Sequence, residues 1–225
     1  MNDPSPMAEP TVDDVRSAAA RLVGVADRTP LLHSRHWSRI ARGDVWLKAE
    51  CLQRTGSFKI RGATNLIASL PSRGAGAGVI AASAGNHAQG VAVAARSAGV
   101  AATIVMPRTA SMAKIEATCA YGAEVALAGE SYSEAAELME RLAAERGLTI
   151  APAFDDARVV AGQGTIGLEI VADLPDVDQV LVPVGGGGLA AGVALAVKAL
   201  RPATRVIGVQ AAAAPAAFAP LAQRA

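Results

Sequence analysis

The chain has 225 residues, of which 52% are hydrophobic and 18% are charged, and its formal net charge at pH 7 is +1. This apolar content is enough to bury one large core or two smaller lobes. The nearly balanced charge excludes the electrostatic field that would attract nucleic acid or an anionic membrane. We therefore expect a globular protein whose partner is a small molecule.

The cysteines and the N-terminus bear on the cell compartment. Cys51 and Cys119, the only cysteines, lie far apart and outside any C-x-x-C pattern, which argues against a disulfide framework and a zinc site. The first ten residues contain acidic residues and prolines but no apolar run, so the sequence predicts neither a signal peptide nor a membrane span. These observations favour a cytoplasmic protein with free thiols.

The first predicted element is a helix over residues 11–24. Thr11 is a suitable N-cap, and two aspartates follow in the first turn, where the helix dipole favours negative charge. A short strand is expected at 45–47 and a helix at 58–70.

From residue 79 onward, apolar strands alternate with helices, a pattern typical of parallel βαβ units with right-handed crossovers. Two such series, separated near residues 154–161, predict the α/β class with two lobes facing a cleft. The predicted strands are 79–82, 102–106, 124–127, 149–151, 179–184 and 205–209, and the predicted helices are 87–98, 111–121, 133–146, 164–172 and 189–200.

A run of four glycines lies between a predicted strand and the helix that begins near Leu189. Backbone N–H groups at such a turn, with the positive helix end behind them, suit an anionic phosphate. The structural alternative is a turn that is merely flexible. Four glycines there would cost conformational entropy without any compensating interaction. The residues are Gly185, Gly186, Gly187 and Gly188.

Dinucleotide binding is a second alternative for this turn, because Gly185, Gly187 and Ala190 satisfy the G-x-G-x-x-A spacing. That fingerprint requires an acidic residue at the end of the next strand. Here this strand ends at Gln210, which is neutral, so a phosphate alone fits better.

A second segment places the amine of Lys59 beside the ring of Phe58 at a predicted helix start. The positive end of the helix dipole should disfavour the charged form of the lysine, which favours Schiff-base chemistry. Phe58 could shield the amine from water. The alternative is a solvated surface lysine, the better interpretation for a lysine considered in isolation.

A third segment follows the strand 79–82. Its small residues and the amide of Asn86 form a set of donors at a strand-to-helix junction that suits a carboxylate. We interpret His87 as structural, with its ring bonded locally, because the motif has no paired carboxylate. His33, His36 and His87 lack the spacing of metal ligands, so no metal site is expected.

Together, these segments resemble the fold-type II pyridoxal-phosphate enzymes in order and separation. Residues 52–63 resemble the cofactor-lysine motif of threonine dehydratases, and 81–90, 161–169 and 182–188 match further segments. The resemblance covers nearly the whole chain and implies a tryptophan-synthase-β-like architecture of two three-layer αβα lobes with mainly parallel sheets. In this architecture residues 1–75 begin the large lobe and carry the cofactor lysine, 76–155 form the small lobe, and 156–225 continue the large lobe with the phosphate loop.

The resemblance also implies roles for individual residues. Lys59 carries pyridoxal 5'-phosphate on its amine, Phe58 packs against the cofactor, and Asn86 bonds its ring hydroxyl. The glycine run and the adjoining Leu189 hold the phosphate. The loop that takes the substrate carboxylate consists of Ser83, Ala84, Gly85, Asn86 and His87.

The implied activity is that of a deaminating dehydratase, or ammonia-lyase. L-Threonine or L-serine would be converted to 2-oxobutanoate or pyruvate plus ammonia, with the freed amine of Lys59 removing the α-proton and the cofactor acting as the electron sink. Threonine and serine differ by one methyl group, and this difference is too small for the sequence to rank them as substrates. The intact protein is expected to be a homo-oligomer, by default a dimer.

Three departures keep alternatives open. Serine racemases on this scaffold commonly have a serine where this chain has Ala84, and they bind a cation through an acid near the position of Gln210. Racemisation and metal dependence are therefore less favoured than elimination, although a racemase or a β-replacement enzyme stays the alternative. The chain also stops at Ala225, earlier than the family members do, so we expect a C-terminally truncated member, and an inactive fragment is the third alternative.

Overall fold

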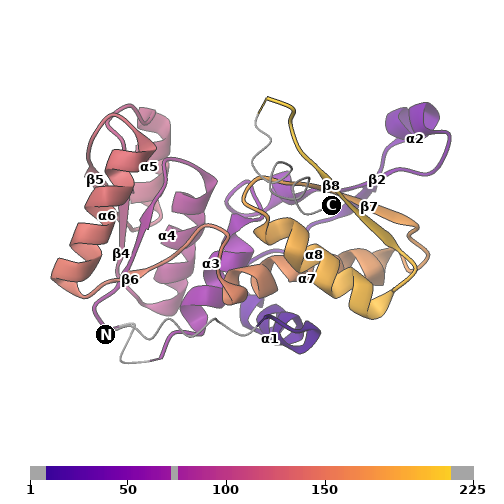
Figure 1. The fold of residues 1–225 in the computed structure, drawn as a ribbon, viewed down its shortest axis with the longest axis horizontal. Helices are drawn as coiled ribbons and strands as arrows, with labels where there is room; N and C mark the ends of the chain where they lie inside the picture. Colours follow the sequence, from indigo (N-terminus) through magenta and orange to yellow (C-terminus); the bar gives the residue numbers. More distant parts are fainter. Residues whose placement is uncertain (1–8, 72–75, 214–225) are drawn as a thin grey trace, which may run out of the picture.

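The structure is a computed structural model that describes residues 9–71 and 76–213 (Figure 1). The helices are α1 (Val12–Leu22), α2 (Arg35–Ala41), the 3₁₀ turn η1 (Glu50–Leu52), α3 (Lys59–Ala68), α4 (Asn86–Ala98), α5 (Met112–Ala120), α6 (Tyr132–Arg146), α7 (Ala157–Asp173) and α8 (Gly188–Leu200). The strands are β1 (Leu31–His33), β2 (Trp46–Lys48), β3 (Val79–Ala82), β4 (Ala102–Met106), β5 (Glu124–Leu127), β6 (Thr149–Ile150), β7 (Gln179–Pro183) and β8 (Arg205–Val209).

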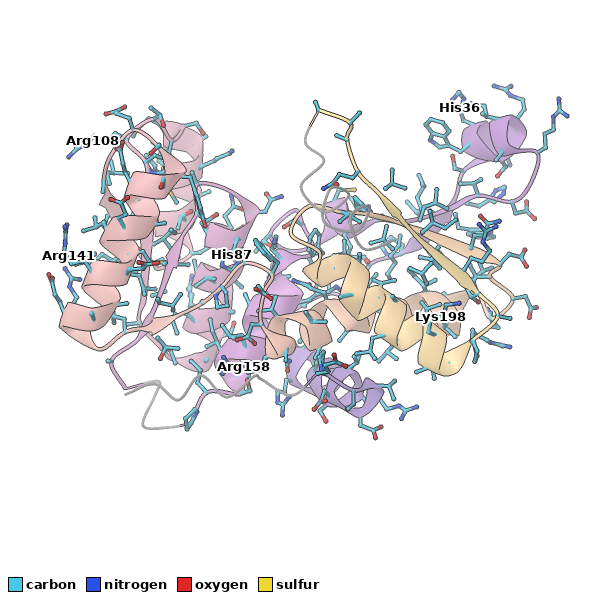
Figure 2. The ribbon with its side chains drawn as sticks, in the orientation of Figure 1. His36, His87, Arg108, Arg141, Arg158 and Lys198 are labelled. Atoms are coloured by element: carbon cyan, nitrogen blue, oxygen red, sulfur yellow. The ribbon has the colours of Figure 1, made fainter. Side chains whose placement is uncertain are left out.

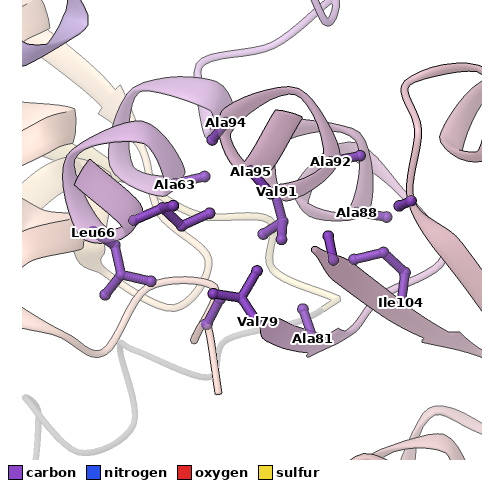
Figure 3. Packing of buried hydrophobic residues seen from close by; sticks show 14 of the residues in the cluster. Ala63, Leu66, Val79, Ala81, Ala88, Val91, Ala92, Ala94, Ala95 and Ile104 are labelled. Carbon is purple, nitrogen blue, oxygen red and sulfur yellow. The ribbon is translucent and has the colours of Figure 1, made fainter. Parts of the chain in front are cut away.

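Strands β3 to β6 form a parallel sheet in the order β5-β4-β3-β6. The central strands β3 and β4 are buried along their whole length because both faces of the sheet are covered. Ile80 and Val105 pack against α6 on one face, while Val79 and Ile104 pack against α4 on the other (Figure 3). The prediction of parallel βαβ units, and of the α/β class, is confirmed.

Strands β7 and β8 form a separate parallel sheet. Alternate residues of β7, Val180 and Val182, are buried against α7 and α8. In Figure 1 this sheet and its helices lie beside the four-stranded unit, with α3 between the two groups. Helix α3 packs against both α4 and α7, so it connects the two groups.

Small residues bring these helices close together. A Cβ on Gly162 of α7 would lie 2.6 Å from the Cα of Gly62 on α3. A Cβ on Gly90 of α4 would lie 3.0 Å from the carbonyl carbon of Lys59. These contacts fix the start of α3 against both neighbours, because a side chain at either glycine would force the backbones apart.

The first helix is as expected from the sequence. The Thr11 side chain accepts a hydrogen bond from the backbone N of Asp14, whose carboxylate accepts one from the backbone N of Thr11. This capping box satisfies two N–H groups at the start of α1. No helix in the part of the chain that the structure describes is long and apolar enough to cross a membrane.

The structure differs from the prediction around residues 154–161. The two series do separate near this point, but the next helix was expected to begin near residue 164, whereas α7 begins at Ala157 and runs unbroken to Asp173. Asp156 caps it by accepting a hydrogen bond from the backbone N of Arg158. The prediction also missed β1, α2 and η1, which have no fully buried residues.

Candidate active site

Lys59 is the first residue of α3, and its side chain is partly buried. Its Nζ donates a hydrogen bond to the carbonyl oxygen of Ala153 at 2.7 Å and lies 5.4 Å from the centre of the Phe58 ring. Burial lowers the pKa of the amine. The direction agrees with the prediction, and its cause is the loss of water around the buried amine.

The glycine run lies between β7 and α8. Gly187 has a φ of +91°, a left-handed conformation that favours glycine, and α8 begins at Gly188. The first N–H groups of a helix have no partner within the helix, so they are available to an anion at this turn.

One cavity of about 170 Å³ joins the glycine run to Lys59. The structure therefore brings together two elements that are more than 120 residues apart in the sequence. The cavity is lined by Phe58, Lys59, Ala153, Phe154, Gln163, Pro183, Gly185, Gly186, Gly187, Gly188 and Leu189. All the lysine-segment and glycine-segment candidates are in this set.

Residues 151–154, which we name the covering segment, contact both sides of this cavity. The Ala153 carbonyl accepts the hydrogen bond from Lys59. A Cβ on Gly186 would collide with the ring of Phe154, and one on Gly188 would lie 2.7 Å from the Phe154 carbonyl oxygen. Sequence reasoning missed this segment because it expected a link between lobes here, and a contact with the glycines exists only in the fold.

The carboxylate loop lies close to Lys59 but does not line the cavity. Ser83, Ala84 and Gly85 are partly buried in the turn after β3, and Asn86, the first residue of α4, is exposed. Asn86 lies one helical turn before Gly90, whose Cα faces the backbone of Lys59, so the two share a helix face. The loop thus stands at the same end of α3 as the lysine.

His87 is buried in the middle of the molecule (Figure 2). Its Nε2 lies 2.8 Å from the carbonyl oxygen of Ala151. The expectation that the ring bonds locally is wrong, because this partner is 64 residues further along the chain. The bond ties α4 to the covering segment.

A buried ion-pair network fixes the other face of α3. The guanidinium of Arg61, which is 2% exposed, donates to Glu50 at 2.8 and 2.9 Å and to Glu169 at 2.6 and 3.0 Å. Glu169 also pairs with Lys48 at 2.5 Å. Every member is hydrogen-bonded, so the network joins α3 to α7 and to the segment before α3 without leaving a buried charge unpaired.

Comparison with known proteins agrees with this site. A family model described as pyridoxal-phosphate dependent enzyme matches residues 24–225. The chain belongs to this family. L-Threonine ammonia-lyase from Thermotoga maritima is 52% identical over 200 residues, which are 89% of this chain and 50% of that protein. The chain spans about half the length of the curated relatives that it matches.

Solved structures are also similar to this chain. The processed form of threonine deaminase isoform 2 from Solanum lycopersicum matches with a TM-score of 0.82 and 41% identity, over 90% of this chain and 58% of that one. Serine racemase from Dictyostelium discoideum matches with a TM-score of 0.91 and 32% identity, over 96% of this chain and 70% of that one.

The residues present fit the cofactor of this family. A lysine amine with a lowered pKa faces a turn of glycine N–H groups across one cavity. A Cβ at Gly185 or Gly187 would meet no atom within 4 Å, so the backbone is open there to an approaching phosphate. Phe58 and Leu189 add apolar walls.

Proposed function

We propose that the protein is a threonine/serine ammonia-lyase that converts L-threonine or L-serine to 2-oxobutanoate or pyruvate plus ammonia. The observation that carries the proposal is the cavity shared by the Lys59 amine and the glycine run. The likeness to a protein named L-threonine ammonia-lyase supports the choice of reaction. Because the chain spans about half of such relatives, the activity of the whole protein is a proposal.

In this proposal the cofactor is held from two sides. Lys59 binds it through its amine, and Phe58 packs against it. The N–H groups of Gly185 to Gly188 and of Leu189 hold its phosphate at the start of α8. Asn86 donates to its ring hydroxyl, and the loop from Ser83 to His87 takes the substrate carboxylate.

The chemistry places specific demands on Lys59. Its Nζ donates to the Ala153 carbonyl in this structure, and it must lose its extra proton before it can bond to the cofactor. Once the substrate has displaced it, the amine removes the α-proton, and a lowered pKa keeps more of it neutral and able to accept that proton. The bound cofactor supplies the electron sink for the elimination.

Serine racemisation is the second candidate, supported by the structural likeness to a serine racemase. It needs a proton carrier on the opposite face of the substrate from Lys59. The loop has Ala84, whose methyl group cannot carry a proton, where we expect a racemase to have a serine. Formation of D-serine from L-serine would favour this candidate, and oxo-acid formation alone favours the lyase.

We further propose a cytoplasmic protein that works as a homo-oligomer, most simply a dimer. Cys51 and Cys119 are both exposed and free, which suits a reducing compartment. Soluble enzymes form symmetric dimers more often than other assemblies. Sedimentation of the whole protein and cell fractionation test these two points.

The decisive experiment traps the cofactor on its lysine. The chain is incubated with pyridoxal 5'-phosphate, reduced with borohydride and digested, and the modified peptide is identified by mass spectrometry. We expect the label on Lys59, its loss in Lys59→Ala, and its retention in Lys198→Ala, a change at an exposed position of α8 (Figure 2). Equal labelling of Lys48, Lys114 and Lys198 would contradict the proposal.

A further inference from the structure

Gln163 is a buried polar side chain with an unused hydrogen-bond acceptor. It is 1% exposed, yet its Oε1 has no hydrogen-bond partner among the described residues. Leaving a buried acceptor unpaired is costly, so native proteins rarely do so without a reason. The one other such side-chain atom in the described part of the chain is Oγ1 of Thr64, and Thr64 does not line the cavity.

The position of Gln163 relates it to Lys59. A Cβ on Gly62 would collide with the amide of Gln163, whose Nε2 is the nearest atom, so this side chain lies directly on Gly62. Lys59 and Gly62 are three residues apart on α3 and therefore share a helix face. Both Gln163 and Lys59 line the candidate cavity. The residue that carries the unpaired acceptor therefore shares one small cavity with Lys59.

Among the residues that line this cavity, one other than Gln163 has a side chain that can donate a hydrogen bond to Oε1 of Gln163. Apart from Gln163 itself, the residues that line the cavity are apolar or glycine, with the exception of Lys59. An ammonium group has three N–H donors and no acceptor. The Ala153 carbonyl accepts one of these bonds, so further donors of the same group are available.

We propose that Gln163 is a positioning residue whose Oε1 accepts a hydrogen bond from Nζ of Lys59 when Nζ turns away from the Ala153 carbonyl. The inference rests on the proposed function, in which Lys59 is released at each turnover. The released amine then has an acceptor on each side of the cavity, one on the covering segment and one on α7. Gln163 holds it within reach of the substrate instead of leaving it free to rotate.

The acceptor also favours the charged form of the amine, because a carbonyl dipole stabilises an ammonium group. Other charged groups near Lys59 do not mask this effect. His87 on α4 is buried, and its pKa is lowered to about 4 by burial, so it is neutral near pH 7. Arg61 on α3 is paired with two carboxylates, and Arg158 on α7 is paired with Asp156.

The test measures the titration of Lys59 in the chain without cofactor. Wild type, Gln163→Met and Gln163→Glu are labelled with acetic anhydride across a range of pH, and acylation of Lys59 is followed by mass spectrometry. Methionine removes the acceptor at similar length, so labelling at a fixed pH below the pKa should rise by about threefold to tenfold, as a pKa lower by half a unit to one unit produces. Glutamate adds a negative charge, so labelling should fall.

Thr64→Val is the matched control. It removes the other unpaired buried polar atom, and it should leave the titration of Lys59 unchanged. Circular dichroism melting curves establish whether each variant is folded. If Gln163→Glu does not fold, Gln163→Met alone decides the test. Unchanged Lys59 titration in folded Gln163→Met would overturn the inference. Failure of borohydride trapping at Lys59 in wild type would instead overturn the proposed function, so the two failures are distinguishable.

Discussion

His87 donates a hydrogen bond from Nε2 to the carbonyl oxygen of Ala151, at 2.8 Å. The bond joins the first turn of α4 to the end of β6, and so to the segment that covers the candidate cavity. Burial lowers the pKa of His87 to about 4, and the nearby charge of Lys59 acts in the same direction. The ring is therefore neutral near pH 7, and Nε2 must carry the hydrogen because a carbonyl oxygen can only accept.

This lowered pKa makes the stability of the fold depend on pH. Between pH 6.5 and 4 the unfolded chain binds a proton at His87 that the folded chain does not, so the free energy of unfolding falls as the pH falls through this window. The expected loss is about 3 kcal/mol. Urea unfolding at several pH values should show this slope, and His87→Asn should flatten it. His36→Asn, at an exposed position, should leave the slope unchanged.

Removing Arg61 should destabilise the fold strongly. Arg61→Met leaves Glu50 and Glu169 buried without their common partner, and breaking one side of a buried ion pair typically costs about 3 to 5 kcal/mol. Chemical unfolding measures the loss. Arg141→Met is the control, since Arg141 pairs with Glu145 at 4.0 Å on the exposed surface of α6, where such pairs contribute little. Equal effects of the two changes would contradict the network.

Gly192→Ala should separate α7 from α8. A Cβ at this position would lie 2.6 Å from the backbone N of Gly164, which cannot move without shifting the helix. We expect a loss of about 1 to 3 kcal/mol in the free energy of unfolding. Gly43→Ala is the control, because a Cβ there meets nothing within 4 Å. If both variants unfold at the same urea concentration, the two helices are not in backbone contact.

The sequence predicted the elements that bury a face and missed those that do not. Strands such as 79–82 and 102–106 were predicted with their observed bounds because their residues are continuously apolar. Helix α2 has no buried residue, so it has no apolar stripe to reveal it. Helix α7 was expected to begin only near residue 164, whereas it begins at Ala157, and its Gly162 and Gly164 allow close contact with α3 and α8.

The candidate site could be predicted only in part, for a similar reason. The segments with Lys59 and the glycine run have local patterns that indicate their chemistry. Ala153, Phe154 and Gln163 have none: an alanine carbonyl, an aromatic ring and an amide enter the cavity only through contacts between distant elements. The match of residues 161–169 to the family pattern marked the stretch that contains Gln163, but the unpaired Oε1 is a property of the packed structure.

The ring of Phe154 lies against Gly186 in the glycine run. A Cβ on Gly186 would collide with the Phe154 ring. Phe154 is 44% exposed, so its removal should cost little by itself. The collision that an alanine at 186 introduces should therefore depend on the ring, whereas backbone strain at the neighbouring Gly187 should not.

A double-mutant cycle tests this dependence. Gly186→Ala should lower the free energy of unfolding by about 1 to 3 kcal/mol in wild type, because the ring must move, and by much less in the Phe154→Ala background. Gly187→Ala should cost about 1 to 2 kcal/mol in both backgrounds, because its φ of +91° strains any residue with a Cβ. If Gly186→Ala costs the same with and without the ring, Phe154 does not lie on the glycine run, and the covering segment leaves that side of the cavity open.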